Sequence, residues 1–220
     1  MKKALPILLA VLLLLSSGCL KKKEKNPPTI SLSIDGELGE NDWYVSNVTI
    51  SMKAMDNESI VKELRYRING EPWNDYVMPF SIKRDGYYFI EYYAVDGNGN
   101  EREGNLSIKI DKTKPSVEFT NFEEGYIYFR GKKFITPRIP RDTMVIGDYT
   151  IEVKANDVLS GMQKVEFYLG EAKIQEDVEK PYEWEIKKAY GIYNVTAIAY
   201  DMAGNANMIS IDEVQFINLK

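Results

Sequence analysis

The sequence predicts an all-β protein with two tandem β-sandwiches behind an N-terminal export signal. A motif of the form Asp-x-x-Gly-Asn occurs twice, at residues 96–100 and 201–205. Each copy ends a β-like run that begins with a glycine and has a tyrosine two residues later. After the signal, no segment of useful length has the period of a helix. Short strands and turns that recur in a block of about a hundred residues are typical of a β-sandwich.

The N-terminal residues predict a signal peptide. Lys2 and Lys3 precede an apolar run over residues 4–15, and small residues at 16–18 come just before Cys19. A basic, an apolar and a small-residue segment in this order are typical of secretory signals.

Cys19 is the only cysteine in the chain, so no intramolecular disulfide can form. Its position resembles the lipobox of prokaryotic lipoproteins, in which the cysteine accepts the lipid and becomes the new N-terminus. The lipobox usually has a large aliphatic residue three positions before the cysteine, where this chain has Ser16. We expect a signal peptide over residues 1–18, then a lipidated Cys19 and a flexible stalk over residues 19–27. The alternative is an uncleaved anchor over residues 4–20. Both hypotheses export the chain and anchor it to the outer face of the cell membrane.

The repeat places the first domain at residues 28–114 and the second at residues 115–220. Alternating apolar and polar residues predict strands at equivalent places in the two domains, over 49–56 and 150–157, then 64–68 and 165–169. The glycine-initiated runs at 86–95 and 191–200 come next, and final strands cover about 106–110 and 209–217. Pro115 ends the linker over residues 111–115 and stiffens it.

The second domain carries extra sequence near its start. Residues 125–134 predict a hairpin that turns at Arg130 and Gly131, and the stretch that follows contains Arg138 and Arg141. The favoured interpretation is a solvated hairpin packed on a sheet edge. The alternative is a docking loop for an anionic partner.

The composition argues against an enzyme and against nucleic acid as a partner. The formal net charge is -5, whereas phosphate contacts need a basic face. The chain has no histidine, which removes the usual general base and the commonest zinc ligand. We therefore expect no catalytic residue, no cofactor and no metal.

Several segments resemble the Ig-like repeats of bacterial and archaeal surface proteins, some of which are filed under an outer-membrane-protein name. In the first domain these are residues 38–44, 66–73, 86–101 and 108–115, and in the second domain residues 165–168, 181–184 and 199–205. The resemblance implies Ig-like sandwiches used as spacer, adhesion or accessory modules, without shared catalytic residues. Tyr88 and Tyr193 are candidates for the tyrosine corner of such domains. Ile90 and Val195 stand where an antibody domain has cysteine, so each core must rest on packing alone.

The repeated turns have two interpretations. Asp96, Asn98 and Asn100 alternate as oxygen ligands often do in calcium loops. The second copy keeps only Asp201 and Asn205, and no bidentate glutamate follows the first copy at the needed distance. Turn chemistry, in which Asp and Asn side chains bind nearby backbone groups, is therefore favoured.

Aromatic residues outside the repeated strands are candidates for stacking on sugar rings, namely Trp43, Tyr44, Trp73 and Trp184. In a sandwich without disulfides such residues more often fill the core or cover an edge. A sugar platform requires the three tryptophans to be exposed in one plane.

Four Asn-x-Ser/Thr sequons are present, at Asn47, Asn57, Asn105 and Asn194. In an exported protein they are acceptors for N-linked glycans. Asn194 lies inside a predicted strand, so Asn47, Asn57 and Asn105 are the candidate glycosylation sites.

The whole sequence predicts a non-enzymatic cell-surface lipoprotein whose Ig-like domains act as adhesion, spacer or protein-interaction modules. The expected partners are the membrane, through the lipid anchor, and a surface protein or glycan. The alternative function is that of a carbohydrate-binding accessory protein at the cell surface.

Overall fold

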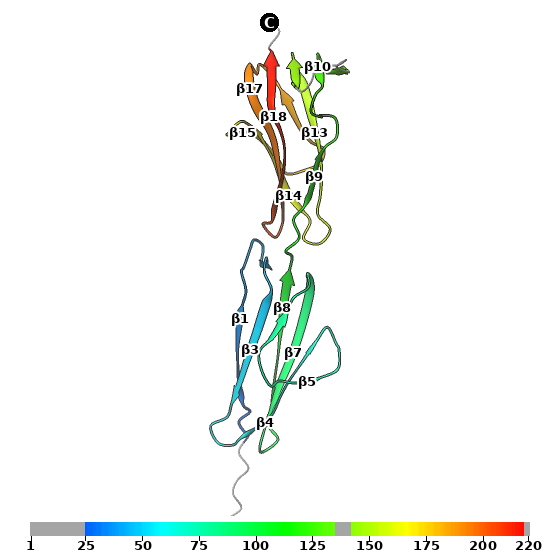
Figure 1. The fold of residues 1–220 in the computed structure, drawn as a ribbon. Helices are drawn as coiled ribbons and strands as arrows, with labels where there is room; N and C mark the ends of the chain where they lie inside the picture. Colours follow the sequence, from blue (N-terminus) through cyan, green and yellow to red (C-terminus); the bar gives the residue numbers. More distant parts are fainter. Residues whose placement is uncertain (1–24, 135–141, 218–220) are drawn as a thin grey trace, which may run out of the picture.

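The computed structural model describes residues 25–134 and 142–217. All regular structure in these residues is β-strand, which confirms the predicted fold class. Figure 1 shows two groups of strands stacked end to end, with β1 to β8 in one group and β9 to β18 in the other. These residues contain no helix that could cross a membrane. The predicted signal peptide and Cys19 lie outside the described residues.

The first domain packs a three-stranded sheet against a five-stranded sheet. The order in the smaller sheet is β1 (Thr29–Asp35), β3 (Val48–Met55) and β6 (Phe80–Ile82). The order in the larger sheet is β2 (Trp43–Tyr44), β8 (Glu101–Ile110), β7 (Gly86–Asp96), β4 (Val61–Ile68) and β5 (Asn74–Asp75).

The second domain repeats this plan. Its smaller sheet has the order β16 (Tyr182–Ile186), β13 (Tyr149–Asn156) and β9 (Ser116–Phe119). Its larger sheet has the order β11 (Lys132–Phe134), β10 (Ile127–Phe129), β12 (Met144–Ile146), β18 (Ala206–Ile217), β17 (Gly191–Asp201), β14 (Met162–Leu169) and β15 (Ala172–Asp177). β2 and β12 each run parallel to the last strand of their domain. The eight strands of the first domain therefore have counterparts in the second, which adds β10 and β11 at one edge of its larger sheet.

Residues alternate between the two faces of each strand, and the side chains that face the opposite sheet form the core of each domain. In the first domain, Val48 and Ile50 of β3 share a fully buried cluster with Ile90 of β7. In the second domain, Phe167 of β14 and Trp184 of β16 occupy one core. The two clusters are separate, so each domain has a core of its own.

The strands predicted from alternation are present, but two of them begin earlier than predicted. The pattern indicated strands from Leu64 and Val165, whereas β4 begins at Val61 and β14 at Met162. Both strands have an irregular register near their first residues, at Val61/Glu63 and at Met162/Lys164. A bulge shifts the side chains by one position, and it therefore hides the strand start from a period-2 pattern.

Both predicted tyrosine corners are present. The Tyr88 hydroxyl donates a hydrogen bond to the Arg84 carbonyl oxygen at 2.8 Å, and the Tyr193 hydroxyl donates one to the Tyr190 carbonyl oxygen at 3.2 Å. Ile90, which stands where an antibody domain has cysteine, is fully buried.

The predicted hairpin of the second domain is formed by β10 and β11, with Arg130 and Gly131 at positive φ in its turn. It lies at the edge of the seven-stranded sheet, as the packing interpretation requires. Arg138 and Arg141 lie outside the described residues, so the docking-loop alternative stays a prediction.

Candidate functional site

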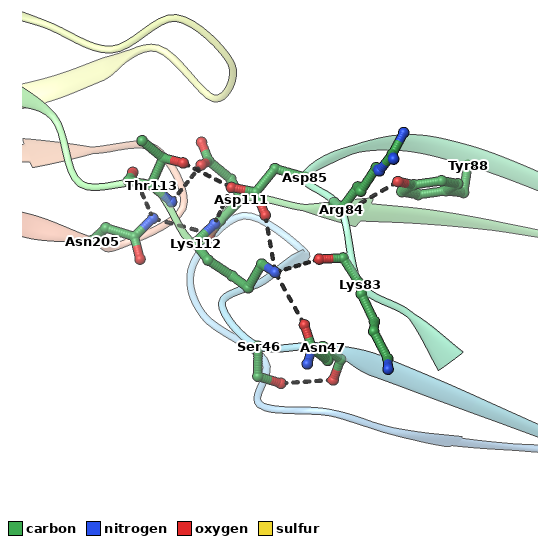
Figure 2. Close-up of polar contacts among 10 residues, drawn as sticks. All are labelled: Ser46, Asn47, Lys83, Arg84, Asp85, Tyr88, Asp111, Lys112, Thr113 and Asn205. Carbon is green, nitrogen blue, oxygen red and sulfur yellow. Dashed lines mark hydrogen bonds and ion pairs between the residues drawn. The ribbon is translucent and has the colours of Figure 1, made fainter. Parts of the chain in front are cut away.

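The linker between the domains is bound to the first domain through Lys112 (Figure 2). The Lys112 Nζ atom donates hydrogen bonds to the Lys83 carbonyl oxygen at 2.6 Å and to Asn47 Oδ1 at 3.0 Å. The same atom lies 3.4 Å from Asp85 Oδ1. One linker side chain is therefore held by two separate segments of the first domain.

Asp85 also binds the backbone of the linker. Its Oδ2 atom accepts hydrogen bonds from the Lys112 N–H at 3.1 Å and from the Thr113 hydroxyl at 2.8 Å. Burial raises the pKa of the Asp85 carboxyl, but these hydrogen bonds and the Lys112 charge together outweigh it and lower the pKa. The side chain is thus kept ionised and acts as a fixed acceptor for the linker.

The second domain holds the same linker from the other side. Asn205 Nδ2 donates to the Asp111 carbonyl oxygen at 3.0 Å and to the Thr113 carbonyl oxygen at 3.4 Å (Figure 2). The Ser160 N–H donates to Asp111 Oδ2 at 3.0 Å. The linker is therefore bound by both domains.

A loop of the first domain also contacts a turn of the second domain directly. The Glu40 N–H donates to the Ala203 carbonyl oxygen, and Asn41 Nδ2 donates to the Met202 carbonyl oxygen, both at 2.9 Å. A Cβ atom added to Gly39 would lie 2.3 Å from the Ala203 carbonyl oxygen. Since no side chain fits there, the glycine permits this close approach of two backbones.

The repeated Asp-x-x-Gly-Asn turns are built by local hydrogen bonds. Asp96 Oδ1 accepts the N–H groups of Asn98 and Asn100, each at 2.8 Å, and Asp201 Oδ1 accepts the Asn205 N–H at 2.8 Å. These bonds confirm the favoured turn interpretation.

Each turn also binds the segment that enters its own domain. Asn100 Nδ2 donates to the Asn26 carbonyl oxygen at 3.4 Å, as Asn205 does to the linker. In the second domain the entering segment is the linker, so the same turn becomes part of the joint between the domains.

Three carboxylates meet at this joint. Asp111, Asp157 and Asp201 each contribute one carboxylate oxygen, and these three oxygens lie within 4.8 Å of one another. Burial and the charges of the two other carboxylates raise the pKa of Asp201, against the effect of its hydrogen bonds from Asn205. Spacing along the chain gives no sign of this cluster, because Asp111 comes from the linker and the others from two separate turns. The expectation of no metal stays a prediction.

The three tryptophans do not form one plane, and the three-residue sugar platform is therefore wrong. Trp43 and Trp184 are each 4% exposed, whereas Trp73 is 39% exposed. Tyr44 packs against the core of the first domain. The Trp184 indole fills the core of the second domain, as aromatic residues in sandwiches without disulfides commonly do. Trp43 lies outside the core cluster of the first domain, and its ring packs edge-on against Tyr87 at 5.0 Å.

Trp73 lies over the outer face of the five-stranded sheet, beside an open groove of about 310 Å³. The side chains that line this groove include Arg67, Glu91, Glu103 and Asn105. Arg67, Glu91 and Asn105 lie opposite one another on the adjacent strands β4, β7 and β8.

The candidate glycosylation sites lie at three different places. Asn47 and Asn57 are exposed in loops on either side of β3, and Asn105 is exposed on β8 within the groove. Asn194 is also exposed, and its Oδ1 atom accepts the Glu213 N–H at 3.1 Å. Glycosylation stays a prediction at each of them.

Comparison with known proteins supports Ig-like repeats. Residues 139–197 match the family model of a bacterial Ig domain. Among solved structures, the chain is similar to the fibronectin(III)-like modules of CbhA from Clostridium thermocellum, with 21% identity and a TM-score of 0.42 over 86% of this chain and 97% of that chain. It is also similar to carbohydrate-binding modules from the β-sandwich superfamily, with 13% identity and a TM-score of 0.35 over 90% of this chain and 88% of that chain. A bacterial ice-binding adhesin is similar at 12% identity and a TM-score of 0.34, over 90% of this chain and 67% of that chain. No curated protein matches the chain.

Proposed function

We propose that the protein is a non-enzymatic, exported lipoprotein that is anchored through Cys19 and uses its two Ig-like domains as a stiff spacer at the cell surface. The observation that carries the spacer role is the joint, where the linker binds both domains and a loop of the first domain binds the second. A spacer of this kind holds its distal end at a fixed distance from the membrane, where it meets a surface protein or glycan.

The stiffness follows from the number of independent contacts at the joint. A free linker of this length would let two domains rotate, because interdomain motion is the default when few contacts cross a boundary. Here Lys112 is bound by the first domain and Asp111 by the second. The contact between Glu40 and Ala203 adds a second connection away from the linker.

Distance measurements by pulsed electron paramagnetic resonance test the spacer role. The mature chain with Cys19→Ala has no cysteine, so spin labels can be attached to cysteines introduced at exposed Lys62 in the first domain and exposed Glu171 in the second. We expect one narrow distance distribution. A broad distribution would contradict a stiff spacer.

Cell fractionation tests the anchor. We expect the wild-type protein in the membrane fraction and the Cys19→Ala variant in the soluble fraction, because the thiol is the proposed site of lipid attachment. Retention of the variant in the membrane would instead favour the uncleaved anchor over residues 4–20. The two tests are independent, since the first uses only the soluble domains.

The second candidate function is that of a carbohydrate-binding accessory protein. One observation favours it, namely the exposed Trp73 ring beside a groove lined by polar side chains. Because sugar rings have an apolar face and a rim of hydroxyls, such sites commonly combine an indole with hydrogen-bonding groups.

A further inference from the structure

The outer face of the five-stranded sheet carries a ring that is fixed in place and still open to solvent. Trp73 is 39% exposed. The Tyr93 ring meets it edge-on at 4.7 Å, and the Arg67 guanidinium carbon lies 4.7 Å from its ring centroid. A ring held by two neighbours loses little conformational freedom when a ligand stacks on it, which favours binding.

The arginines of this face already have partners. Arg67 makes two hydrogen bonds of 2.7 Å to the two carboxylate oxygens of Glu91, and Arg65 makes one of 2.7 Å to Asp75. A bidentate pair of this kind leaves little positive charge for an anionic ligand. The face therefore suits a neutral ligand better than a phosphate, a sulfate or a uronic acid.

Two polar side chains in the groove have no partner of their own. Glu103 and Asn105 are exposed on β8, and neither side chain makes a hydrogen bond or an ion pair within the described part of the chain. They offer acceptors and donors in the same groove as the Trp73 indole. The groove volume of about 310 Å³ lies at the lower end of the range of about 300–1,000 Å³ for small-molecule sites.

We propose that this groove binds a neutral polysaccharide, with a sugar ring stacked on Trp73 and its hydroxyls hydrogen-bonded by Glu103, Asn105 and the Arg67–Glu91 pair. The inference deepens the second candidate function by giving its site and ligand class, and it does not depend on the spacer role. An aromatic surface with paired charges serves such a ligand because hydroxyls accept and donate hydrogen bonds without carrying charge.

Native gel electrophoresis in gels that contain a soluble polysaccharide tests the proposal. The protein is the mature chain with Cys19→Ala, made in a host that attaches no N-glycan. The gels contain a β-glucan, a galactomannan or a xylan as neutral probes, and alginate as the anionic probe. We expect retardation by at least one neutral probe and none by alginate. Trp73→Ala should weaken the retardation at least tenfold, and Trp73→Phe should weaken it less.

Two further variants keep the test interpretable. Asn105→Arg fills the groove from an exposed position and should abolish retardation while Trp73 stays intact. Tyr190→Ala removes an aromatic side chain that is 75% exposed in the second domain, and it should change nothing. Equal retardation of the wild-type and Trp73→Ala proteins, retardation by alginate alone, or no retardation by any neutral probe would overturn the proposal. A glycan found on Asn105 of the native protein would also overturn it, because that glycan would occupy the groove.

Discussion

At the scale of single residues, Glu166 is a buried carboxyl whose pKa is strongly lowered by its neighbours. It is 5% exposed on β14 and is surrounded by cations and a hydroxyl. Lys164 Nζ and Lys173 Nζ donate to its Oε1 atom at 2.7 and 2.6 Å, and the Tyr168 hydroxyl donates to its Oε2 atom at 2.8 Å. Burial alone would raise the pKa of Glu166, but these three donors outweigh it and lower the pKa to about 2.

We expect the Glu166→Gln substitution to destabilise the second domain at neutral pH. The pKa falls from 4.5 in the unfolded chain to about 2 in the folded one. The ionised carboxylate therefore stabilises the fold above pH 4.5, and this stabilisation is lost as the pH falls towards 2. At about 1.4 kcal/mol per pKa unit, the fall from 4.5 to about 2 corresponds to a loss of about 3–4 kcal/mol at pH 7. Urea unfolding at pH 7 and at pH 3 measures it.

Glu176→Gln is the matched control for this prediction. Glu176 shares the same two lysines but its side chain is 37% exposed, so solvent screens its ion pairs. Its replacement should therefore cost less stability than that of Glu166. Equal stability of the wild-type and Glu166→Gln proteins at pH 7 would contradict the role given to Glu166.

At the scale of elements, the repeated Asp-x-x-Gly-Asn turn binds its own aspartate in both domains but a different neighbouring segment in each. In both copies the asparagine side chain binds the aspartate of its own turn, at 2.7 Å in the first domain and 2.8 Å in the second. In the first domain it also binds the chain at Asn26, whereas in the second it binds the linker. The difference lies in what precedes each domain and not in the turn itself.

Paired substitutions separate these two tasks. Asn100→Ala and Asn205→Ala should each destabilise their own domain by about 1–3 kcal/mol, because each leaves a buried aspartate with fewer hydrogen bonds. Only Asn205→Ala should also broaden the distance distribution between labels in the two domains. If both variants broaden it equally, the joint is not held by Asn205.

The sequence pattern predicted the strands in which apolar and polar residues alternate. It missed strand segments that are exposed on both faces or too short to show a period. The glycine-initiated runs predicted β7 and β17 well, because one face of each strand is buried along most of its length. The polar stretch from Glu101 to Asn105 concealed the first half of β8, which is exposed there. The edge strand β2 has two residues and a parallel partner, so no periodicity could reveal it.

The candidate site was less predictable than the fold. The tryptophans suggested a sugar platform, but the burial of each indole depends on its neighbours in the folded chain, and of the three only Trp73 is exposed. The contacts of the joint connect residues as far apart as Glu40 and Ala203. Such pairs leave no local pattern, because they depend on how two finished domains meet.

At the scale of the whole molecule, the two sandwiches lie end to end, and the joint is the narrow region between them (Figure 1). Each domain has its own core, so the joint adds rigidity without being needed for either fold. The two domains approach closely at Gly39, where an added Cβ would lie 2.3 Å from the Ala203 carbonyl oxygen of the second domain and 2.7 Å from Val45 Cγ1 of the first.

We therefore expect Gly39→Ala to loosen the molecule without unfolding either domain. The added methyl group must push the loop away from the turn, at a cost of about 1–3 kcal/mol for an overpacked contact. The spin-label distance distribution between positions 62 and 171 should broaden, while urea unfolding of the second domain stays unchanged. Gly97→Ala is the control, because its nearest neighbours lie at an ordinary 3.5 Å. A narrow distribution in Gly39→Ala would mean that the linker contacts of Lys112 and Asn205 hold the domains in line by themselves.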